Sequence, residues 1–284
     1  MQHWCLKLNC LKWVNCFSRA STLLALLYFV PLNPVAASQW INYWELGAGI
    51  SYFHIPYYSG GVGSKNYLLP FPHILVESDY LSLERNVISG HLFSTDEFKV
   101  DISFSGALKA DSNDIELRKG MPDLNYVIEA GPSLKWLLQG EFNKDYELTF
   151  ELPIHRVVTT DLRQVDAIGW RYKPGLYVKK KYPGWTVNAD VSLLYATQDY
   201  HAYFYSVDNA YVTADRSAYR ASSGFSGVEY SLKFKTHSKN MNMGFLMIYT
   251  RLDQAVFNDS PLVAETNSLT LGVYASWVFW GSAK

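Results

Sequence analysis

The feature that most constrains this chain is an alternation of apolar and polar side chains, with a period of two residues, that recurs along most of its length. Successive side chains of a β-strand point to opposite faces, so this alternation predicts strands with one apolar face. The clearest examples cover residues 44–52, 98–108, 146–154, 185–195 and 269–279. Weaker examples cover residues 124–130, 168–178, 228–234 and 243–249. The sequence therefore predicts an all-β fold.

The apolar faces of these strands are expected to contact a membrane. After residue 37 the sequence has no run of about 18 apolar residues, which excludes helical spans, whereas tilted membrane strands need only about 9 to 11 residues. Aromatic residues make up 16% of the chain and gather at predicted strand ends, as Trp and Tyr do at membrane–water interfaces. They are Trp40, Tyr43, Trp44, Tyr52, Phe53, Tyr57 and Tyr58 around the first strand, and Tyr200, Tyr203, Phe204 and Tyr205 after residue 195. A soluble periplasmic β-protein is the alternative, because aromatic clusters also fill soluble cores.

The number of strands follows from length. About 20 residues for each strand with its connection predict a transmembrane antiparallel β-barrel of about 12 strands, with 10 to 14 as the range. An even number places both termini on the periplasmic side. Pro132, Pro153 and Pro174 conflict with continuous strands because proline cannot donate a ladder hydrogen bond. Each is expected to mark a bulge or a strand end.

The first 37 residues have the pattern of a cleavable signal peptide. Lys7, Lys12 and Arg19 precede an apolar run over residues 23–30, which is too short for a retained membrane anchor. Small residues at positions 35–37 place the cleavage before Ser38. The expected organisation is therefore a signal peptide over residues 1–37 and one outer-membrane barrel over residues 38–284.

The three cysteines, Cys5, Cys10 and Cys16, all precede this cleavage site, so disulfides are not expected in the mature chain. None follows the apolar run, which argues against a lipoprotein anchor. Without residues 1–37, the chain has 22 Lys and Arg residues and 26 Asp and Glu residues, which gives a formal net charge of −4. Nucleic acid is therefore not an expected partner.

Several Gly- and Pro-containing pieces occur in a fixed order along the chain. The first is Pro-Tyr-Tyr-Ser-Gly at residues 56–60, followed by Tyr67 and by Leu-Pro-Phe-Pro at residues 69–72. The second is Gly-Met-Pro-Asp-Leu at residues 120–124, which leads to Glu-Ala-Gly-Pro-Ser at residues 129–133. Further pieces are Gly169-Trp170 with Pro174, residues 205–207, residues 218–221 with Gly224 and Gly227, residues 255–263, and Trp277-Val278-Phe279-Trp280. The composition of residues 56–72 also predicts turns.

In this order the pieces resemble the MipA/OmpV family of outer-membrane proteins, over essentially all of the chain after residue 37. Gly61 and Gly63 are extra glycines relative to the family pattern. The resemblance implies a mid-sized outer-membrane barrel. It also implies a scaffold protein that links a lytic transglycosylase, which is a murein hydrolase, with a murein synthase during cell-wall growth. No matched residue is an established contact.

Catalytic and metal-binding patterns are not found. The histidines after residue 37 are scattered without metal-ligand spacing, and no Gly-x-Ser-x-Gly element occurs. They are His54, His73, His91, His155, His201 and His237. A carboxylate-oriented base is conceivable at His155, near Glu147 and Glu151, but a solvated histidine at a strand end is the favoured interpretation. We expect no enzyme, no cofactor and no metal site.

Alternation places a set of charged side chains inside the predicted barrel. They are Glu45, Lys99, Asp101, Glu129, Glu147, Glu151, Asp190, Lys233 and Lys235. Their mixed signs favour ion pairs across the lumen over a strongly selective pore, although a narrow channel for small solutes stays open. The scaffold is the first functional hypothesis, the channel the second, and a lipid-modifying enzyme a distant third.

Overall fold

A computed structural model describes residues 43–77, 81–84, 87–236, 238 and 240–282. The predicted signal peptide and Trp40 lie outside these residues. In chain order the strands are β1 (Tyr43–Pro56), β2 (Ser64–Glu77), β3 (Leu81–Glu84), β4 (Val87–Ser94), β5 (Phe98–Ala107), β6 (Tyr126–Gly140), β7 (Tyr146–Thr160), β8 (Val165–Tyr172), β9 (Gly175–Tyr182), β10 (Trp185–Ala196), β11 (Gly224–Thr236), β12 (Met241–Arg251) and β13 (Asn267–Gly281). The helical elements are η1 (Ser112–Asp114), η2 (Glu116–Arg118), α2 (Gln198–Tyr205) and η3 (Asn209–Tyr211).

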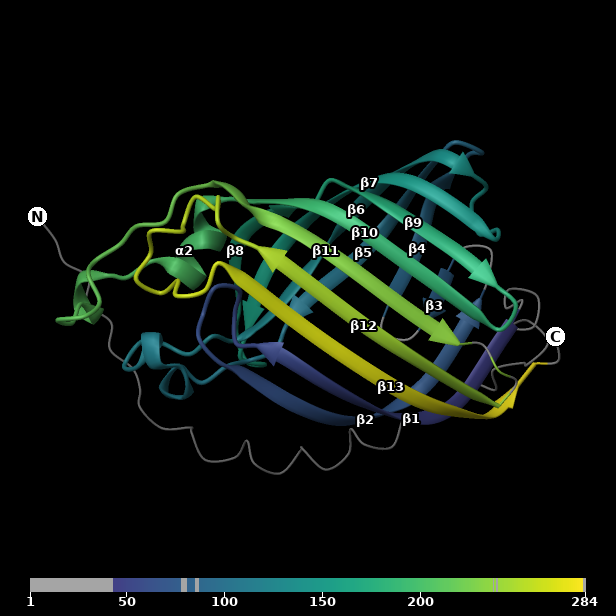
Figure 1. The fold of residues 1–284 in the computed structure, drawn as a ribbon, viewed down its shortest axis with the longest axis horizontal. Helices are drawn as coiled ribbons and strands as arrows, with labels where there is room; N and C mark the ends of the chain where they lie inside the picture. Colours follow the sequence, from purple (N-terminus) through teal and green to yellow (C-terminus); the bar gives the residue numbers. More distant parts are fainter. Residues whose placement is uncertain (1–42, 78–80, 85–86, 237, 239, 283–284) are drawn as a thin grey trace, which may run out of the picture. The chain divides into compact units, whose positions relative to one another are not determined.

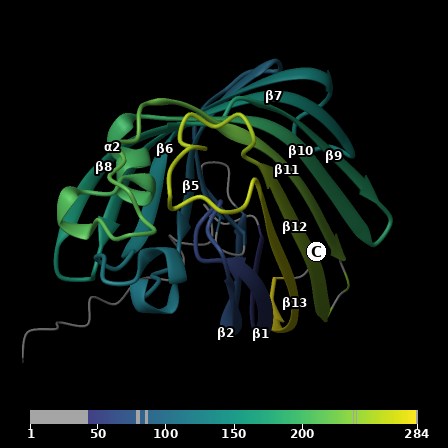
Figure 2. The ribbon, with the colours of Figure 1, turned by 60° about the vertical axis from the view of Figure 1, so that its left-hand side comes forward.

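The strands form one ring of antiparallel pairs (Figures 1 and 2). β13 pairs with β1 and β10 pairs with β11, so strand pairing continues around the whole sheet. β8 and β9 share one position in the ring, since both pair with β7 on one side and with β10 on the other. The structure thus confirms the predicted antiparallel barrel of twelve strand positions. No helix among the described residues is long and apolar enough to cross a bilayer.

Alternation along each strand separates the two surfaces of the barrel. On β1, Ile50 and Tyr52 are each 44% exposed, whereas Ser51 between them is 6% exposed. Outward-facing Trp136, Leu193, Phe234 and Trp277 are likewise exposed. Such a belt of large apolar side chains on the outside of a closed sheet is the arrangement that faces lipid.

Among the three prolines in predicted strands, only Pro174 interrupts a strand of the ring. Lys173 and Pro174 separate β8 from β9, so the predicted strand end at Pro174 is confirmed. Pro153 lies on β7 opposite this break, and its carbonyl accepts a hydrogen bond from the Lys173 N–H at 3.2 Å. Near Pro132 the pairing of β6 with β7 lapses and then resumes in the same register. The prediction of a bulge or a strand end is therefore wrong for Pro132 and Pro153. Both prolines lie within continuous strands, because each faces a place where the hydrogen bonds to a neighbouring strand are interrupted and no N–H donor is needed.

The segments with clear alternation are all strands, but three strands were not predicted. β2, β3 and β4 lie between residues 64 and 94, and the interpretation of residues 56–72 as turns is wrong from Ser64 onward. The reason is that β2 is apolar on both faces, with Leu68 outward and Leu69 inward, and contains Pro70 and Pro72. The weak segment at residues 124–130 covers only the beginning of β6, and residues 168–178 span the break between β8 and β9.

Candidate functional site

One side of the lumen is filled by ion pairs. The Arg171 guanidinium lies 2.8 Å from Glu129, and the Lys135 ammonium lies 3.1 Å from Asp101. Further pairs are Lys179–Glu147 at 2.9 Å, Lys173–Glu229 at 2.5 Å, Lys99–Asp101 at 3.8 Å, Lys135–Glu151 at 3.9 Å and Lys173–Asp190 at 3.9 Å. The pairs join strands β5 to β11, and they confirm the expected pairing of opposite charges inside the barrel.

Several members of this network were missed from the sequence. They are Lys135, Arg171, Lys173, Lys179 and Glu229. The signal that could have found them is the alternation itself, followed through the second half of β6 and across the break between β8 and β9. Lys233 is exposed, whereas the other members of the predicted inward set are buried or half-buried.

His155 lies in the middle of this network. Its Nε2 is 2.7 Å from the Oγ of Ser103, and its Nδ1 is 3.4 Å from Glu129, whose other oxygen accepts from Arg171. The expectation of a solvated histidine at a strand end is therefore wrong. β7 continues to Thr160, so residue 155 is a mid-strand position, and its side chain is buried.

A second chain of the same residue types lies elsewhere in the lumen. His73 places Nε2 at 2.8 Å from Glu45 and Nδ1 at 3.2 Å from the Oγ of Ser276. His73 and Ser276 are both fully buried. A serine that no substrate can reach is not a nucleophile, so here the serine–histidine–carboxylate chain satisfies buried polar groups.

The side of the lumen near β1, β2, β12 and β13 is rich in aromatic rings beyond the Glu45–His73 pair. A Cβ on any of three lumen-facing glycines would collide with an aromatic ring: that of Phe71 at Gly49, of Tyr274 at Gly244 and of Phe53 at Gly272. Phe71 and Tyr274 also make an edge-to-face contact, with ring centroids 6.2 Å apart. The glycines thus make room for rings. We call this aromatic side the apolar half of the lumen, although it holds the Glu45–His73 pair, and the side along β5 to β11 the charged half.

One end of the barrel is covered by a loop cap, formed by residues 57–63, 108–125, 197–223 and 252–266. Tyr205 of α2 stacks on Phe257 with centroids 3.7 Å apart, and both rings are buried. The same apolar cluster includes Tyr58, Ile115 and other buried side chains from Ala110, Leu124, Phe204, Ala221, Leu252 and Ala255. Tyr58, Phe204 and Tyr205 therefore belong to a small core, and their predicted place in an interfacial aromatic girdle is wrong.

Polar contacts fasten the four loops of the cap to one another. The Tyr58 hydroxyl donates to the Leu262 carbonyl at 2.5 Å, and the Ser260 hydroxyl donates to the Tyr205 carbonyl at 2.6 Å. Arg118 donates to the Phe204 carbonyl at 3.0 Å. Burial raises the pKa of Tyr58 to about 12, which the neighbouring Arg118 partly offsets, so this hydroxyl stays protonated and donates at neutral pH. The cap is a packed structure that covers this end of the lumen.

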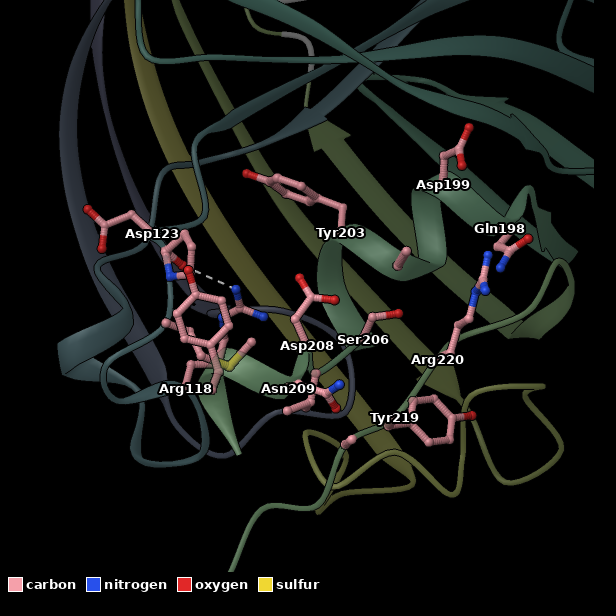
Figure 3. A pocket seen from close by; sticks show the side chains of 16 residues that line it. Arg118, Asp123, Gln198, Asp199, Tyr203, Ser206, Asp208, Asn209, Tyr219 and Arg220 are labelled. Atoms are coloured by element: carbon pink, nitrogen blue, oxygen red, sulfur yellow. Dashed lines mark hydrogen bonds between the residues drawn. The ribbon is translucent and has the colours of Figure 1, made fainter. Parts of the chain in front are cut away.

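The loops of the cap enclose a pocket of about 800 Å³ (Figure 3). Charged side chains of both signs line it, among them Arg118, Asp123, Asp199, Asp208 and Arg220. Asp123 accepts the Ser112 N–H at 3.0 Å, which is the main reason why its pKa lies below the usual value. This carboxylate thus holds its own loop, and the pocket presents no convergent set of groups for one ligand.

The two other histidines whose side chains the structure describes, His54 and His201, do not form a site. His54 bonds to the side chain of Asn66 at 2.8 Å, and His201 bonds to the Ser222 carbonyl and the Ser226 hydroxyl. His237 lies outside the described residues, as does the side chain of His91. Within the described parts of the chain, no group of three or more His, Cys, Asp or Glu side chains could hold a metal ion.

Comparison with known proteins gives one family. The family model described as "MltA-interacting protein MipA" matches residues 46–279. No curated protein matches the chain. Outer membrane phospholipase A from Escherichia coli is 12% identical with a TM-score of 0.35, covering 82% of this chain and 90% of that one. A Pseudomonas aeruginosa FadL homologue is 8% identical with a TM-score of 0.30, covering 84% and 90%. These values are too low to transfer a function.

Proposed function

Because the chain belongs to the family described as MltA-interacting protein MipA, we propose that it is a docking protein for enzymes of cell-wall growth. The coarser identity is an outer-membrane β-barrel protein. In the proposed role, its periplasmic face binds a murein hydrolase of the lytic transglycosylase class together with a murein synthase. The family match over residues 46–279 is the observation that carries this proposal.

The two ends of the barrel differ in a way that supports docking at the end opposite the cap. Outer-membrane barrels have short turns on the periplasmic side and longer loops outside. The connection of β4 to β5 (residues 95–97) and that of β6 to β7 (residues 141–145) are short, and they lie at the end that carries the start of β1 and the end of β13. These turns are the surface that a periplasmic enzyme would meet.

The turns carry a net negative charge. Asp96 and Glu97 are exposed on the first turn, and Glu141 and Asp145 are exposed on the second, with Lys144 as the one cation between them. The second turn is held in place, because Lys181 donates to the Asn143 carbonyl at 2.9 Å. A rigid acidic surface fits a partner with a basic patch, since complementary charge steers association and fixes orientation.

The test is chemical crosslinking in intact cell envelopes followed by affinity capture of the tagged chain, with an unrelated barrel as control. Selective capture of a lytic transglycosylase or a murein synthase is the expected result. Capture of the control's partners alone would contradict the docking role.

A channel for small solutes is the second candidate, and the charged half of the lumen favours it. The loop cap weighs against it, because a buried apolar cluster covers one end of the lumen. A folded chain that conducts small ions in a planar bilayer at the level of an open porin would favour the channel over the docking protein.

The proposed role requires no catalysis by this chain. Ser103, His155 and Glu129 do form a chain of the kind that activates nucleophiles. However, Arg171 already pairs with Glu129, and His73 and Ser276 of the duplicate chain are fully buried, so both chains are proposed to satisfy buried polar groups. Phospholipid or ester hydrolysis that is lost in Ser103→Ala would refute this.

A further inference from the structure

The barrel wall is incomplete between β2 and β5. β3 pairs with β2 only at Leu75, Val76 and Glu77, and the register of β4 with β5 stops at Gly90 opposite Ile102. From these points toward the loop cap, no strand among the described residues pairs with the free edge of β2 over residues 64–74. None pairs with the free edge of β5 over residues 103–107. Figure 1 shows β3 toward the end of the barrel opposite α2, so the gap lies in the half next to the loop cap.

The short hairpin between these strands cannot close the gap. Glu84 pairs with Val87, so only residues 85–86 connect β3 to β4. The strands of this hairpin thus extend only over Leu81–Glu84 and Val87–Ser94. The gap is therefore set by the length of the hairpin.

The edge of β2 that borders the gap is suited to an apolar environment. β2 pairs with β1 without interruption through Pro70 and Pro72. Because proline has no N–H and alternate residues of a strand direct their amides to the same side, both nitrogens must face the gap. The family's Leu-Pro-Phe-Pro piece thus removes two donors from an edge that would otherwise leave them unsatisfied in lipid.

The same prolines argue against another strand as the occupant. An exposed edge pairs with a second strand through its N–H and C=O groups, and proline on an edge prevents such pairing. A second copy of this chain, or an added peptide strand, would find no donor at Pro70 or Pro72. An occupant without hydrogen-bonding demands fits better.

The lumen is accessible at the gap. Leu69 faces inward, because it lies opposite the inward-facing Ser51 in the register with β1, yet it is 40% exposed. Ser231 faces inward where β11 is paired on both sides, and it is buried. Leu69 is therefore accessible beside the free edge of β2.

The surface behind Leu69 is apolar. Phe71 follows on the same face of β2, and Tyr274 packs against it. His73, the next residue on this face, pairs with Glu45 at 2.8 Å, and the other ion pairs of the lumen lie along β5 to β11. A molecule that entered from the membrane would therefore contact apolar rings along β2 first.

We propose that the gap between β2 and β5 is a lateral opening through which one acyl chain of an outer-membrane lipid enters the apolar half of the lumen. The chain lies along Leu69 and Phe71, where its methylene groups pack against apolar side chains. The glycerol or sugar headgroup stays at the membrane surface. This site adds lipid binding to the proposed docking role and does not depend on it.

The test uses the folded full-length chain in vesicles of phosphatidylethanolamine and phosphatidylglycerol that contain a small fraction of phosphatidylcholine with a diazirine in one acyl chain. After illumination, adducts are located by mass spectrometry. Adducts on inward-facing Leu69 and Phe71, at a level within a few fold of outward-facing Leu68, are expected. Adducts on Leu68 without any on Leu69 or Phe71 would overturn the proposal. Ser231 is the inward-facing control and should carry none.

A variant sharpens this result. Leu69→Glu puts a charge at the entrance and should lower the labelling of Phe71 at least fivefold, while outward positions remain labelled. Ser231→Ala is the matched lumen variant and should leave the labelling of Phe71 unchanged. Unchanged labelling of Phe71 in folded Leu69→Glu would contradict entry beside residue 69. If that variant does not fold, the proposal is judged from the adducts on Leu68, Leu69 and Phe71 in the unmodified chain. Capture of wall enzymes plays no part in either measurement, so the two proposals can fail separately.

Discussion

The Nε2 atom of His155 lies 2.7 Å from the Oγ of Ser103, within the wall of the barrel. His155 thereby links β5 to β7 and, through Glu129, to β6 and Arg171. His155→Phe would leave the Ser103 hydroxyl and one oxygen of Glu129 without this partner. We expect the free energy of unfolding in detergent to fall by about 1–3 kcal/mol, the cost of unsatisfied buried groups.

Urea titration followed by tryptophan fluorescence measures this change. His54→Phe is the control, because His54 bonds only to Asn66 at an exposed position, and it should shift the unfolding midpoint little. Equal effects of the two substitutions would show that the contacts of His155 are not what stabilises the wall.

The pair formed by Arg171 and Glu129 predicts a larger effect. Arg171→Met leaves the buried carboxylate of Glu129 without its cation, so a loss of about 3–5 kcal/mol in unfolding free energy is expected. Adding Glu129→Gln removes the stranded charge and should restore part of the loss. A double variant that is less stable than the sum of the two single changes would contradict the pairing.

The loop cap should open without the barrel unfolding. Phe257→Ala removes the ring that stacks on Tyr205 and should destabilise the cap by about 3–5 kcal/mol. The expected result is faster proteolysis of residues 197–223 and larger ion conductance, with the heat-dependent gel shift of the folded barrel unchanged. Val256→Ala is the control, since Val256 is 37% exposed. Protease resistance equal to that of the unmodified chain would show that the cluster does not hold the cap.

The cap should also loosen in acid because of His201. Burial, partly offset by the hydrogen bond to the Ser222 carbonyl, lowers the pKa of this histidine below 6.5. The unfolded form therefore takes up a proton first, so the contribution of His201 is complete above about pH 6.5 and falls as the pH drops toward the folded pKa. Proteolysis of the cap should accelerate between about pH 7 and pH 5. His201→Gln should reduce this pH dependence, and an unchanged pH profile would exclude His201 as its source.

The sequence predicts the architecture well, because alternation reports directly which face of a strand meets lipid. Residues 98–108 and 185–195 illustrate this, since each matches a strand of the barrel closely. β2 was missed because its inner face carries Leu69 and Phe71 where the lumen is apolar, so the alternation disappears. The lumen network could be predicted only in part. Glu129 and Asp101 follow from alternation, but the position of Arg171 depends on the register shift of β8 against β7 at Val157, which local sequence does not place.

The loop cap could not be predicted, because its contacts join loops that are far apart in the chain. Tyr58 and Leu262, whose hydrogen bond joins the first and last loops, are an example. An aromatic residue after a strand has the same local pattern whether it lies at the membrane interface or in a small core. The prediction that Tyr205 lies at the membrane interface is therefore wrong because the local sequence does not distinguish these two environments.

Charge on the short turns should govern docking. Asp96→Lys combined with Glu97→Lys reverses the acidic surface of the turn between β4 and β5, and recovery of the wall enzyme should fall at least fivefold in envelope capture. Asp215→Lys makes the same kind of change on the loop cap, where Asp215 is exposed, and should have no effect. Equal recovery of the wall enzyme with both variants would show that docking does not depend on the charge of the turns.

The most direct measurement of the docking role is site-specific photocrosslinking in living cells. A benzophenone amino acid replaces Phe142, in the turn between β6 and β7, or Val212, which is 46% exposed on the loop cap. We predict an adduct with a lytic transglycosylase or a murein synthase from position 142 and none from position 212. Absence of any wall-enzyme adduct from position 142, with the barrel folded in the membrane, would contradict docking through this turn.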